Sequence, residues 1–117
     1  MSNGTDENCL FCKIVAGEIQ SAKLYEDAHV FAFEDVHPQA PFHALVVPKR
    51  HLATLDDFSA DDAALAGRLM LAAQRLAAEH GLPGYRVAMN VQSAGGQVIF
   101  HAHLHVLGGR PLKGVLG

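Results

Sequence analysis

The sequence predicts an α+β domain, built from a mainly antiparallel five-stranded sheet with one long helix and a short N-terminal helix. Half of the 117 residues are hydrophobic, which suffices for the packed core of one domain. Short segments rich in β-branched and aromatic residues outnumber the helical segments, and brief turns separate them, as is typical of antiparallel sheets. The predicted order is helix, three strands, helix and two strands.

The chain begins with a polar tail and a short helix. Residues 1–8 contain no apolar run after a basic start, so they predict a flexible tail and not a secretory signal peptide. The helix is expected over residues 9–16, where Gly17 ends it. Residues 9–117 are expected to form a single domain. No segment reaches the roughly 18 apolar residues of a membrane helix, so a cytoplasmic protein without a membrane partner is expected.

Three strands are predicted in the N-terminal half. They are expected at residues 23–26, 29–34 and 43–48. The first two are joined by a tight turn at residues 27–28, and the second is rich in valine and phenylalanine, which favour extended backbone. The two prolines of segment 37–41 lack N–H donors and cannot continue a sheet.

One long helix is predicted over residues 60–80. Ser59 is a good N-cap, acidic residues in the first turn complement the helix dipole, and Gly81 ends the helix. Apolar residues that recur at three- and four-residue spacing form one face. They are Leu65, Leu69, Ala73, Leu76 and Ala77.

The C-terminal third contains two more predicted strands, at residues 85–92 and 98–107. The loop between them includes Gly95, Gly96 and Gln97, which can turn backbone N–H groups and a side-chain amide toward an anion such as a phosphate. Ordinary surface turns have the same composition, so the loop gains meaning only from its neighbours.

Charge and histidine content narrow the classes of function. The formal charge is −3, from 9 Lys and Arg against 12 Asp and Glu, which argues against nucleic acid as a partner because such binding needs a basic face. Eight histidines are far more than average usage predicts. They point to chemistry or metal binding.

Three histidines alternate with apolar residues inside the last predicted strand. On an extended strand His101, His103 and His105 share one face, with neighbouring Cα atoms about 6.6 Å apart and the outer pair about 13 Å apart. Two ligands of one zinc ion lie at most about 4 Å apart, so the three rings cannot all bind one ion. At least one ring is free for other chemistry, and a neutral imidazole is a competent nucleophile near pH 7.

Residues 101–107 match the signature of the histidine triad nucleotide-binding family, in which three histidines alternate with apolar residues. The chain also resembles the Hint branch of that family in segments 34–51, 84–90, 95–97 and 105–110. The resemblance implies a homodimer with a HIT-like fold that hydrolyses nucleoside phosphoramidates, in which adenosine 5′-monophosphate is linked to an amine, through a nucleotidyl-histidine intermediate. The alternatives are a dinucleoside polyphosphate hydrolase and a zinc-stabilised module that binds a nucleotide or a protein with little turnover.

The resemblance also implies a role for individual residues. His103 attacks the α-phosphorus with His105 beside the phosphate, and Asp35 binds the ribose hydroxyls, although Asp35 is equally suited to a turn before the proline-rich segment. The implied phosphate-side contacts are Asn90, Gly96 and Gln97. The implied apolar walls around a purine base are Phe11, Phe33, Val36 and Leu45.

Two positions depart from the Hint branch. That branch commonly has a hydroxyl residue directly after the glutamine, where this chain has Val98, which offers the substrate only its backbone N–H. The tail after Arg110 lacks the tryptophan found in some relatives, which predicts a different specificity.

Cys9 and Cys12 can be a redox pair, a chance pair or half of a zinc site. A thioredoxin-like role requires a strand just before the motif, and none is predicted there. Zinc-bearing relatives complete the site with residues that match His43 and His101, so the resemblance implies a structural Zn²⁺ with four protein ligands. A zinc-bound His43 could not assist the histidine row through hydrogen bonds. The remaining histidines are expected to be surface or local-structure residues: His29, His37, His51 and His80.

Overall fold

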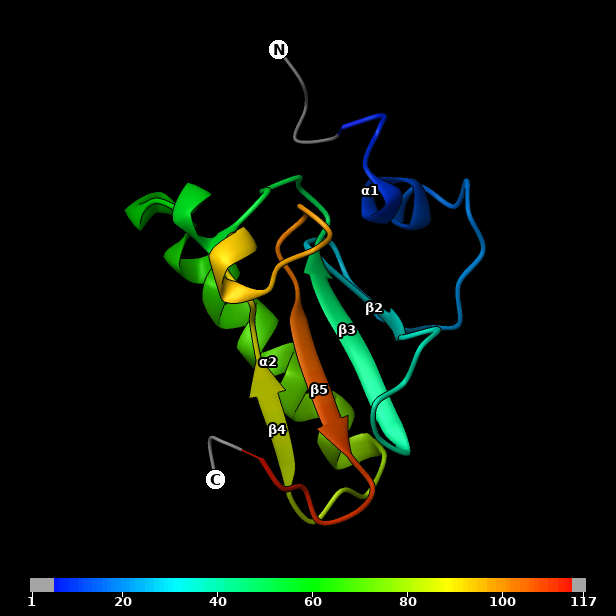
Figure 1. Cartoon of the computed structure of the whole chain (residues 1–117). Helices are drawn as coiled ribbons and strands as arrows, with labels where there is room; N and C mark the ends of the chain where they lie inside the picture. The colour runs from blue at the N-terminus through cyan, green and yellow to red at the C-terminus, as the bar shows by residue number, and fades with distance from the viewer. Residues whose placement is uncertain (1–5, 115–117) are drawn as a thin grey trace.

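A computed structural model describes residues 6–114 and shows the predicted α+β architecture (Figure 1). The α-helices are α1 (Leu10–Val15) and α2 (Ala63–Glu79). The strands are β1 (Lys23–Glu26), β2 (Val30–Glu34), β3 (Phe42–Pro48), β4 (Tyr85–Ala88) and β5 (Leu104–Gly108). Short 3-10 turns occur at Leu55–Asp57, Ala60–Asp62 and Ser93–Gly95.

The five strands form one antiparallel sheet, as predicted, and their order within it is β1-β2-β3-β5-β4. β3 lies at the centre, where Leu45 is opposite Phe33 of β2 and opposite His105 of β5. Ala88 of the edge strand β4 is also opposite His105. This register places the third histidine of the row beside two of the predicted pocket walls.

The two faces of the sheet pack against different helices. α2 lies along one face (Figure 1), where Leu69, Ala73 and Leu76 pack against buried strand residues that include Val46 and Val106. The other face carries a second apolar cluster, in which α1 packs on the sheet. The members from α1 and its N-cap are Cys9, Phe11, Cys12 and Ile14, and those from the sheet are Phe31, Phe33, Leu45 and Val47. Five of the predicted site residues belong to this cluster: Cys9, Phe11, Cys12, Phe33 and Leu45.

α2 begins three residues later than predicted. The Ser59 hydroxyl accepts a hydrogen bond from the Asp61 N–H, and Asp62 accepts one from the Ser59 N–H, so these residues close a 3-10 turn before the α-helix. Asp62 also pairs with Arg50 at 2.8 Å. The predicted apolar face is confirmed, with Leu65 at its half-buried margin.

The last strand is shorter than predicted, because β5 begins at Leu104 and not at residue 98. Pro48, at the end of β3, has no N–H for the ladder, and its carbonyl accepts a hydrogen bond from the His101 ring at 2.7 Å. The Ala102 N–H donates instead to the Leu52 carbonyl at 2.7 Å. His101 and His103 therefore precede the strand.

β4 is also shorter than predicted, and it ends at Ala88. Of the predicted N-terminal tail, residues 1–5 lie outside the described residues, as do residues 115–117 of the C-terminal tail. Asp6 lies against α1, where its N–H donates to Cys12 Sγ at 3.4 Å. No helix within residues 6–114 has both the length and the apolar character needed to span a bilayer.

Candidate active site and metal centre

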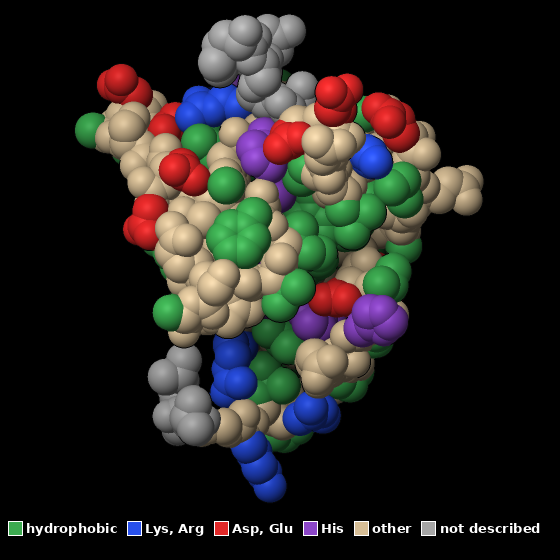
Figure 2. All heavy atoms as spheres, turned by 45° about the horizontal axis from the view of Figure 1, so that its top comes forward, with side chains coloured by type: hydrophobic (Ala, Val, Ile, Leu, Met, Phe, Trp, Pro, Cys, Tyr) green, Lys and Arg blue, Asp and Glu red, His purple; other side chains and the backbone are tan. Residues whose placement is uncertain are grey.

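A pocket of about 470 Å³ lies between α1, the second face of the sheet and the glycine-rich loop. This volume is in the range of small-molecule sites. Figure 2 shows hydrophobic side chains around a hollow with histidine and acidic side chains at its edges. The pocket brings together most of the site residues expected from the sequence: Phe11, Phe33, Asp35, Val36, Leu45, Asn90, Gly96, Val98, His103 and His105.

The apolar part of the pocket has a buried wall and an exposed rim. Phe11 and Phe33 form the wall, with ring centroids 5.4 Å apart in an edge-to-face arrangement, and both are almost fully buried. Val36 and Val98 lie at the rim and are 83% and 87% exposed. A slot with aromatic and aliphatic sides suits a flat heterocyclic ring.

His103 is held in one tautomer by the backbone. Its Nδ1 lies 2.7 Å from the His101 carbonyl oxygen, which can only accept, so Nδ1 carries the proton. Nε2 therefore keeps its lone pair. Burial lowers the pKa of His103 below the usual value, so the neutral ring is the stable form at pH 7. A buried, oriented imidazole with a free Nε2 on the pocket has the chemistry of a nucleophile.

His105 receives the opposite orientation through a chain of hydrogen bonds. The Gln39 N–H donates to His43 Nδ1 at 3.0 Å, so the proton of neutral His43 is on Nε2. His43 Nε2–H then donates to His105 Nδ1 at 2.9 Å, which leaves the proton of His105 on its own Nε2. Burial, followed by the nearby His103 and His43, lowers the pKa of His105 to about 4. The two active-site rings thus differ: one Nε2 carries a lone pair and the other a proton.

Asp35 serves the local turn and faces the histidines. One carboxylate oxygen accepts the His37 N–H at 2.8 Å, and the other lies 3.4 Å from His43 Nε2. Burial lowers the pKa of His43, and the Asp35 charge only partly opposes it. Asp35 also lines the pocket, so the turn role and a ligand role are compatible.

Four side chains of the kinds that bind zinc lie together. Two come from α1 and its N-cap, one from the segment after β3 and one from the segment before β5. The donor atoms of Cys9, Cys12, His51 and His101 all lie within 4.8 Å of one another. Each sulfur lies 3.3 Å from a ring Nδ1, Cys9 from His101 and Cys12 from His51, and the two Nδ1 atoms are 3.2 Å apart. Tetrahedral zinc, with bonds of about 2.0 Å to nitrogen and 2.3 Å to sulfur, places such donors about 3.3 to 3.8 Å apart. The residues fit the ion.

The surroundings prepare this group for a metal. The His101 Nε2–H donates to the Pro48 carbonyl, so the Nδ1 lone pair is directed at the cysteines. The Cys12 N–H donates to Cys9 Sγ, and the Asp6 N–H donates to Cys12 Sγ. Burial raises the pKa of the Cys12 thiol to about 11, so an arriving metal ion has to displace its proton.

Comparisons with known proteins agree with this geometry. Residues 16–112 match the profile of the HIT domain. The chain is 42% identical to a purine nucleoside phosphoramidase of Escherichia coli K12 over 112 residues, which cover 94% of each chain. A HIT family hydrolase from Legionella pneumophila Philadelphia 1 has a similar structure, with a TM-score of 0.89, 48% identity, and coverage of 91% of this chain and 96% of that one. A histidine triad protein from Clostridium difficile has a TM-score of 0.91 at 41% identity, with coverage of 94% and 97%.

The chain belongs to the histidine triad (HIT) family. The resemblance inferred from residues 101–107 is therefore confirmed, as is the expected fold. Within this HIT protein the three histidines have separate environments. His101 lies with the cysteines, His103 lies on the pocket, and His105 joins the pocket to His43.

The metal-ligand group differs from the expected one in a single residue. His51 takes the place predicted for His43, which lies instead with Asp35 and His105. The physical reason is the register of β3: His43 is opposite Leu107, at the far end of the strand from Pro48, whereas His51 follows Pro48 where His101 lies. His51 is therefore no simple surface residue. A signal in the sequence could have identified His51: Pro48 ends the strand β3, and His51 follows it by three residues, at the end of the strand where His101 lies.

Gln97 is close to the pocket but its amide is not directed at an anion. Its Nε2 donates to the carbonyls of Ala53 and Ile99, at 2.7 and 3.0 Å, and its Oε1 accepts the Gln92 N–H at 2.9 Å. The N–H groups of residues 95–97 are bonded within the loop as well. Gln97 therefore fixes the loop shape. Val98 lines the pocket, and its N–H makes no hydrogen bond among those of the described residues.

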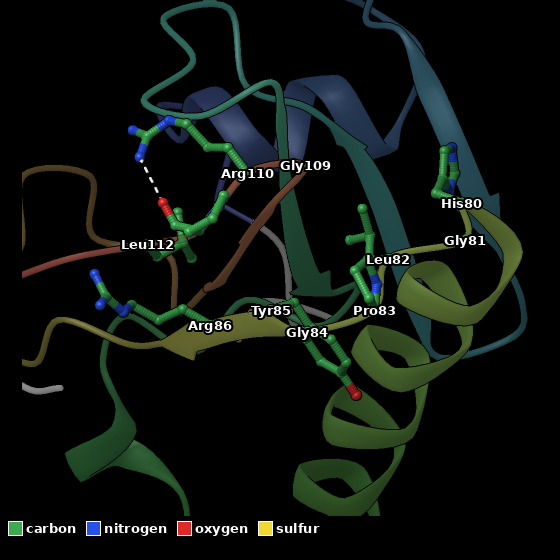
Figure 3. Close-up of a pocket in the computed structure, with 11 residues that line it drawn as sticks. His80, Gly81, Leu82, Pro83, Gly84, Tyr85, Arg86, Gly109, Arg110 and Leu112 are labelled. Atoms are coloured by element: carbon green, nitrogen blue, oxygen red, sulfur yellow. Dashed lines mark hydrogen bonds between the residues drawn. The ribbon is translucent and has the colours of Figure 1, made fainter.

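A second cavity, of about 710 Å³, lies between the turn after α2 and the segment after β5. Figure 3 shows Arg86 and Arg110 on one side of it and His80 and Leu82 on the other. Arg110 donates hydrogen bonds to the carbonyls of Pro111 and Gln39, so its guanidinium attaches the segment after β5 to the segment before β3. None of the predicted site residues lines it. The larger cavity is therefore not where the histidine chemistry is placed.

Proposed function

We propose that this HIT protein hydrolyses nucleoside phosphoramidates, compounds in which a purine nucleoside 5′-monophosphate is linked to an amine, through a nucleotidyl-histidine intermediate. The observation that carries the proposal is the opposite protonation of two neighbouring rings, whose centroids are 5.0 Å apart: a free Nε2 lone pair on His103 and an Nε2–H on His105. The identity with the E. coli purine nucleoside phosphoramidase supports the substrate class.

The proposed reaction has two displacements at phosphorus. In the first, His103 Nε2 attacks the α-phosphorus, an N–P bond forms, and the bond from phosphorus to the leaving amine breaks. The amine departs with a proton, and we assign its donation to His105 Nε2–H, directly or through water. In the second, water attacks the nucleotidyl-histidine, releases the nucleoside monophosphate and restores His103. His105 then recovers its proton from the attacking water.

The substrate orientation follows from the pocket lining. The purine fits between the aromatic wall of Phe11 and Phe33 and the exposed valines of the rim. Asp35 lies on the pocket where a carboxylate can accept hydrogen bonds from both ribose hydroxyls. The phosphate then lies against His103, and Asn90 and the Val98 N–H are the donors that we assign to it, since both residues line the same pocket.

We also propose that Cys9, Cys12, His51 and His101 hold a structural Zn²⁺. Four protein ligands leave no open position, so the ion would supply cross-links between α1 and the segments around residues 51 and 101 rather than chemistry. A homodimer is proposed as well. Its support in this chain is the edge position of β4 and the exposure of Met70 and Leu71 on α2, 52% and 64% respectively.

The decisive test is hydrolysis of adenosine 5′-phosphoramidate, followed by chromatography of released AMP. His103→Ala should lower kcat by at least ~10²–10⁴, and mass spectrometry of the quenched wild-type enzyme should locate the nucleotide on residue 103. His29→Ala, which changes an exposed histidine outside the pocket, is the matched control. An adduct on His105, or near-normal turnover by His103→Ala, contradicts the assignment.

The same assay separates the alternative functions. Faster turnover of diadenosine polyphosphates than of the phosphoramidate indicates a dinucleoside polyphosphate hydrolase. Binding of AMP without turnover of either substrate indicates a binding module.

A further inference from the structure

The short helix α1 lies between the metal-ligand group and the nucleotide pocket. Cys9 is its N-cap and Cys12 is one turn later, so both sulfur donors belong to this element. Leu10, Phe11 and Ile14, from the same turn and the next, line the pocket. One element therefore supplies half of the metal donors and part of the wall against which the base is proposed to lie.

Phe11 touches both sites. Its ring centroid lies 5.2 Å from that of His103, the proposed nucleophile, and 6.0 Å from that of His101, a metal donor, each in an edge-to-face arrangement. Its ring also packs against Phe33 in the same wall of the pocket. Because the ring is only 2% exposed, a shift of α1 moves the wall and the contact with His103 together.

A second link runs through the backbone. The carbonyl of His101 accepts the hydrogen bond that fixes His103 in its nucleophilic tautomer. His101 itself is fully buried and held by Pro48 on one side and by the cysteines on the other. The orientation of the nucleophile therefore depends on a residue of the metal-ligand group.

We propose that Phe11 is a positioning residue that couples the metal-ligand group to the nucleotide pocket, so that the metal ion and the nucleotide bind with positive cooperativity. The proposal rests on the nucleotide site of the proposed function. The physical reason is that a helix of six residues is not stable by itself and depends on its attachments. A metal ion bound to Cys9 and Cys12 fixes α1 in advance, and the nucleotide then does not have to order it.

Thermodynamic reciprocity gives the coupling a testable form. If metal increases the affinity for nucleotide by some factor, nucleotide increases the affinity for metal by the same factor. Typical couplings between sites correspond to about 5- to 150-fold. The Kd for AMP should therefore rise at least about fivefold when zinc is removed. The affinity for zinc should rise by an equal factor when AMP is saturating.

The experiment measures both arms on the full chain. Isothermal titration calorimetry gives the Kd for AMP with zinc saturating and after removal of zinc with a chelator, and circular dichroism at the same temperature reports folding. Competition with a chromophoric chelator gives the zinc affinity with and without AMP. Two variants locate the coupling. Phe11→Leu should keep zinc binding and reduce the coupling factor toward one. Leu45→Ala, which changes a pocket wall on β3 that supplies no metal donor, should weaken AMP equally in both metal states.

Each outcome decides the matter. An AMP affinity that is equal in the two metal states overturns the proposal, and so does a coupling factor that Phe11→Leu leaves unchanged. If the metal-free chain unfolds, the loss of AMP affinity caused by unfolding is the same in both variants. A coupling factor that falls in Phe11→Leu but not in Leu45→Ala therefore still supports the role of Phe11. Intact coupling in a protein that does not turn over phosphoramidates refutes the proposed function and leaves this inference standing. A zinc-loaded protein that does not bind AMP refutes both.

Discussion

Replacing His51 or His43 by alanine separates the metal group seen in the structure from the one expected from sequence. His51 Nδ1 lies 3.3 Å from Cys12 Sγ, whereas His43 bonds to His105 and accepts the Gln39 N–H. His51→Ala should therefore lose zinc at limiting metal concentrations. His43→Ala should keep about one zinc ion per chain and lose activity, because the proton of His105 is then no longer fixed on Nε2.

The size of the stability change follows from mass action. A ligand at 1,000 times its Kd stabilises the native state by about 4.1 kcal/mol. Mutation of a residue that only hydrogen-bonds to a metal ligand typically weakens metal binding about 10- to 100-fold. Removal of a ligand such as His51 should therefore weaken zinc binding at least about a hundredfold. At the same free zinc the remaining stabilisation is about 1.4 kcal/mol. The difference of about 2.7 kcal/mol corresponds to a fall in Tm of about 10 °C for a domain of this size.

The assay combines metal analysis by mass spectrometry with thermal unfolding at buffered free zinc. Excess chelator should bring wild type and His51→Ala to similar Tm values, because the difference between them is metal binding. The reasoning is refuted if His51→Ala retains zinc at wild-type affinity, or if His43→Ala is the variant that loses it.

Three further predictions concern the pocket and its loop. Asp35→Ala should raise KM for ribonucleotide phosphoramidates more than for 2′,3′-dideoxy analogues, since only the former lose a hydrogen bond; equal increases would assign Asp35 to the turn alone. His105 should make the folded protein less stable as pH falls. The unfolded side chain binds a proton below about pH 6.5, whereas the folded side chain, whose pKa is lowered by burial, does so only near pH 4. The urea-unfolding free energy should thus decrease between pH 6.5 and 4, and less so in His105→Gln; an identical pH dependence in the two proteins would contradict this. Gln97→Glu should destabilise the protein by about 1–3 kcal/mol or more in urea, because it places a carboxylate oxygen against two carbonyls; wild-type stability would show that these bonds do not fix the loop.

Local residue patterns were sufficient for the elements of the fold. The apolar spacing from Leu65 to Ala77 defines the buried face of α2 wherever that helix is placed, because helical periodicity is a property of neighbouring residues. The segment after the turn at Asp27 was predicted as a strand from Val30, Phe31 and Phe33, and the structure pairs it with Lys23–Glu26. The histidine signature was similarly local, and it identified the family.

Element ends and donor partners depended on tertiary structure. The run from residue 98 to 103 has strand-forming residues, yet Pro48 offers it no N–H, and the Ala102 N–H donates to the Leu52 carbonyl instead. Likewise the sequence separations of His43 and His51 from the cysteines are similar, so spacing alone could not choose between them. The register of β3 made the choice, since it carries His43 to one end of the sheet and leaves His51 at the other.

The sequence by itself therefore identified the residue types suited to nucleophilic and metal chemistry, because that capacity belongs to the side chain. Tertiary structure decided what each of them does. His101, His103 and His105 are chemically identical, and they differ here only in their hydrogen-bond partners: the Pro48 carbonyl, the His101 carbonyl and the His43 ring. Those partners come from other segments of the chain, and they fix which ring nitrogen carries the proton and which keeps the lone pair.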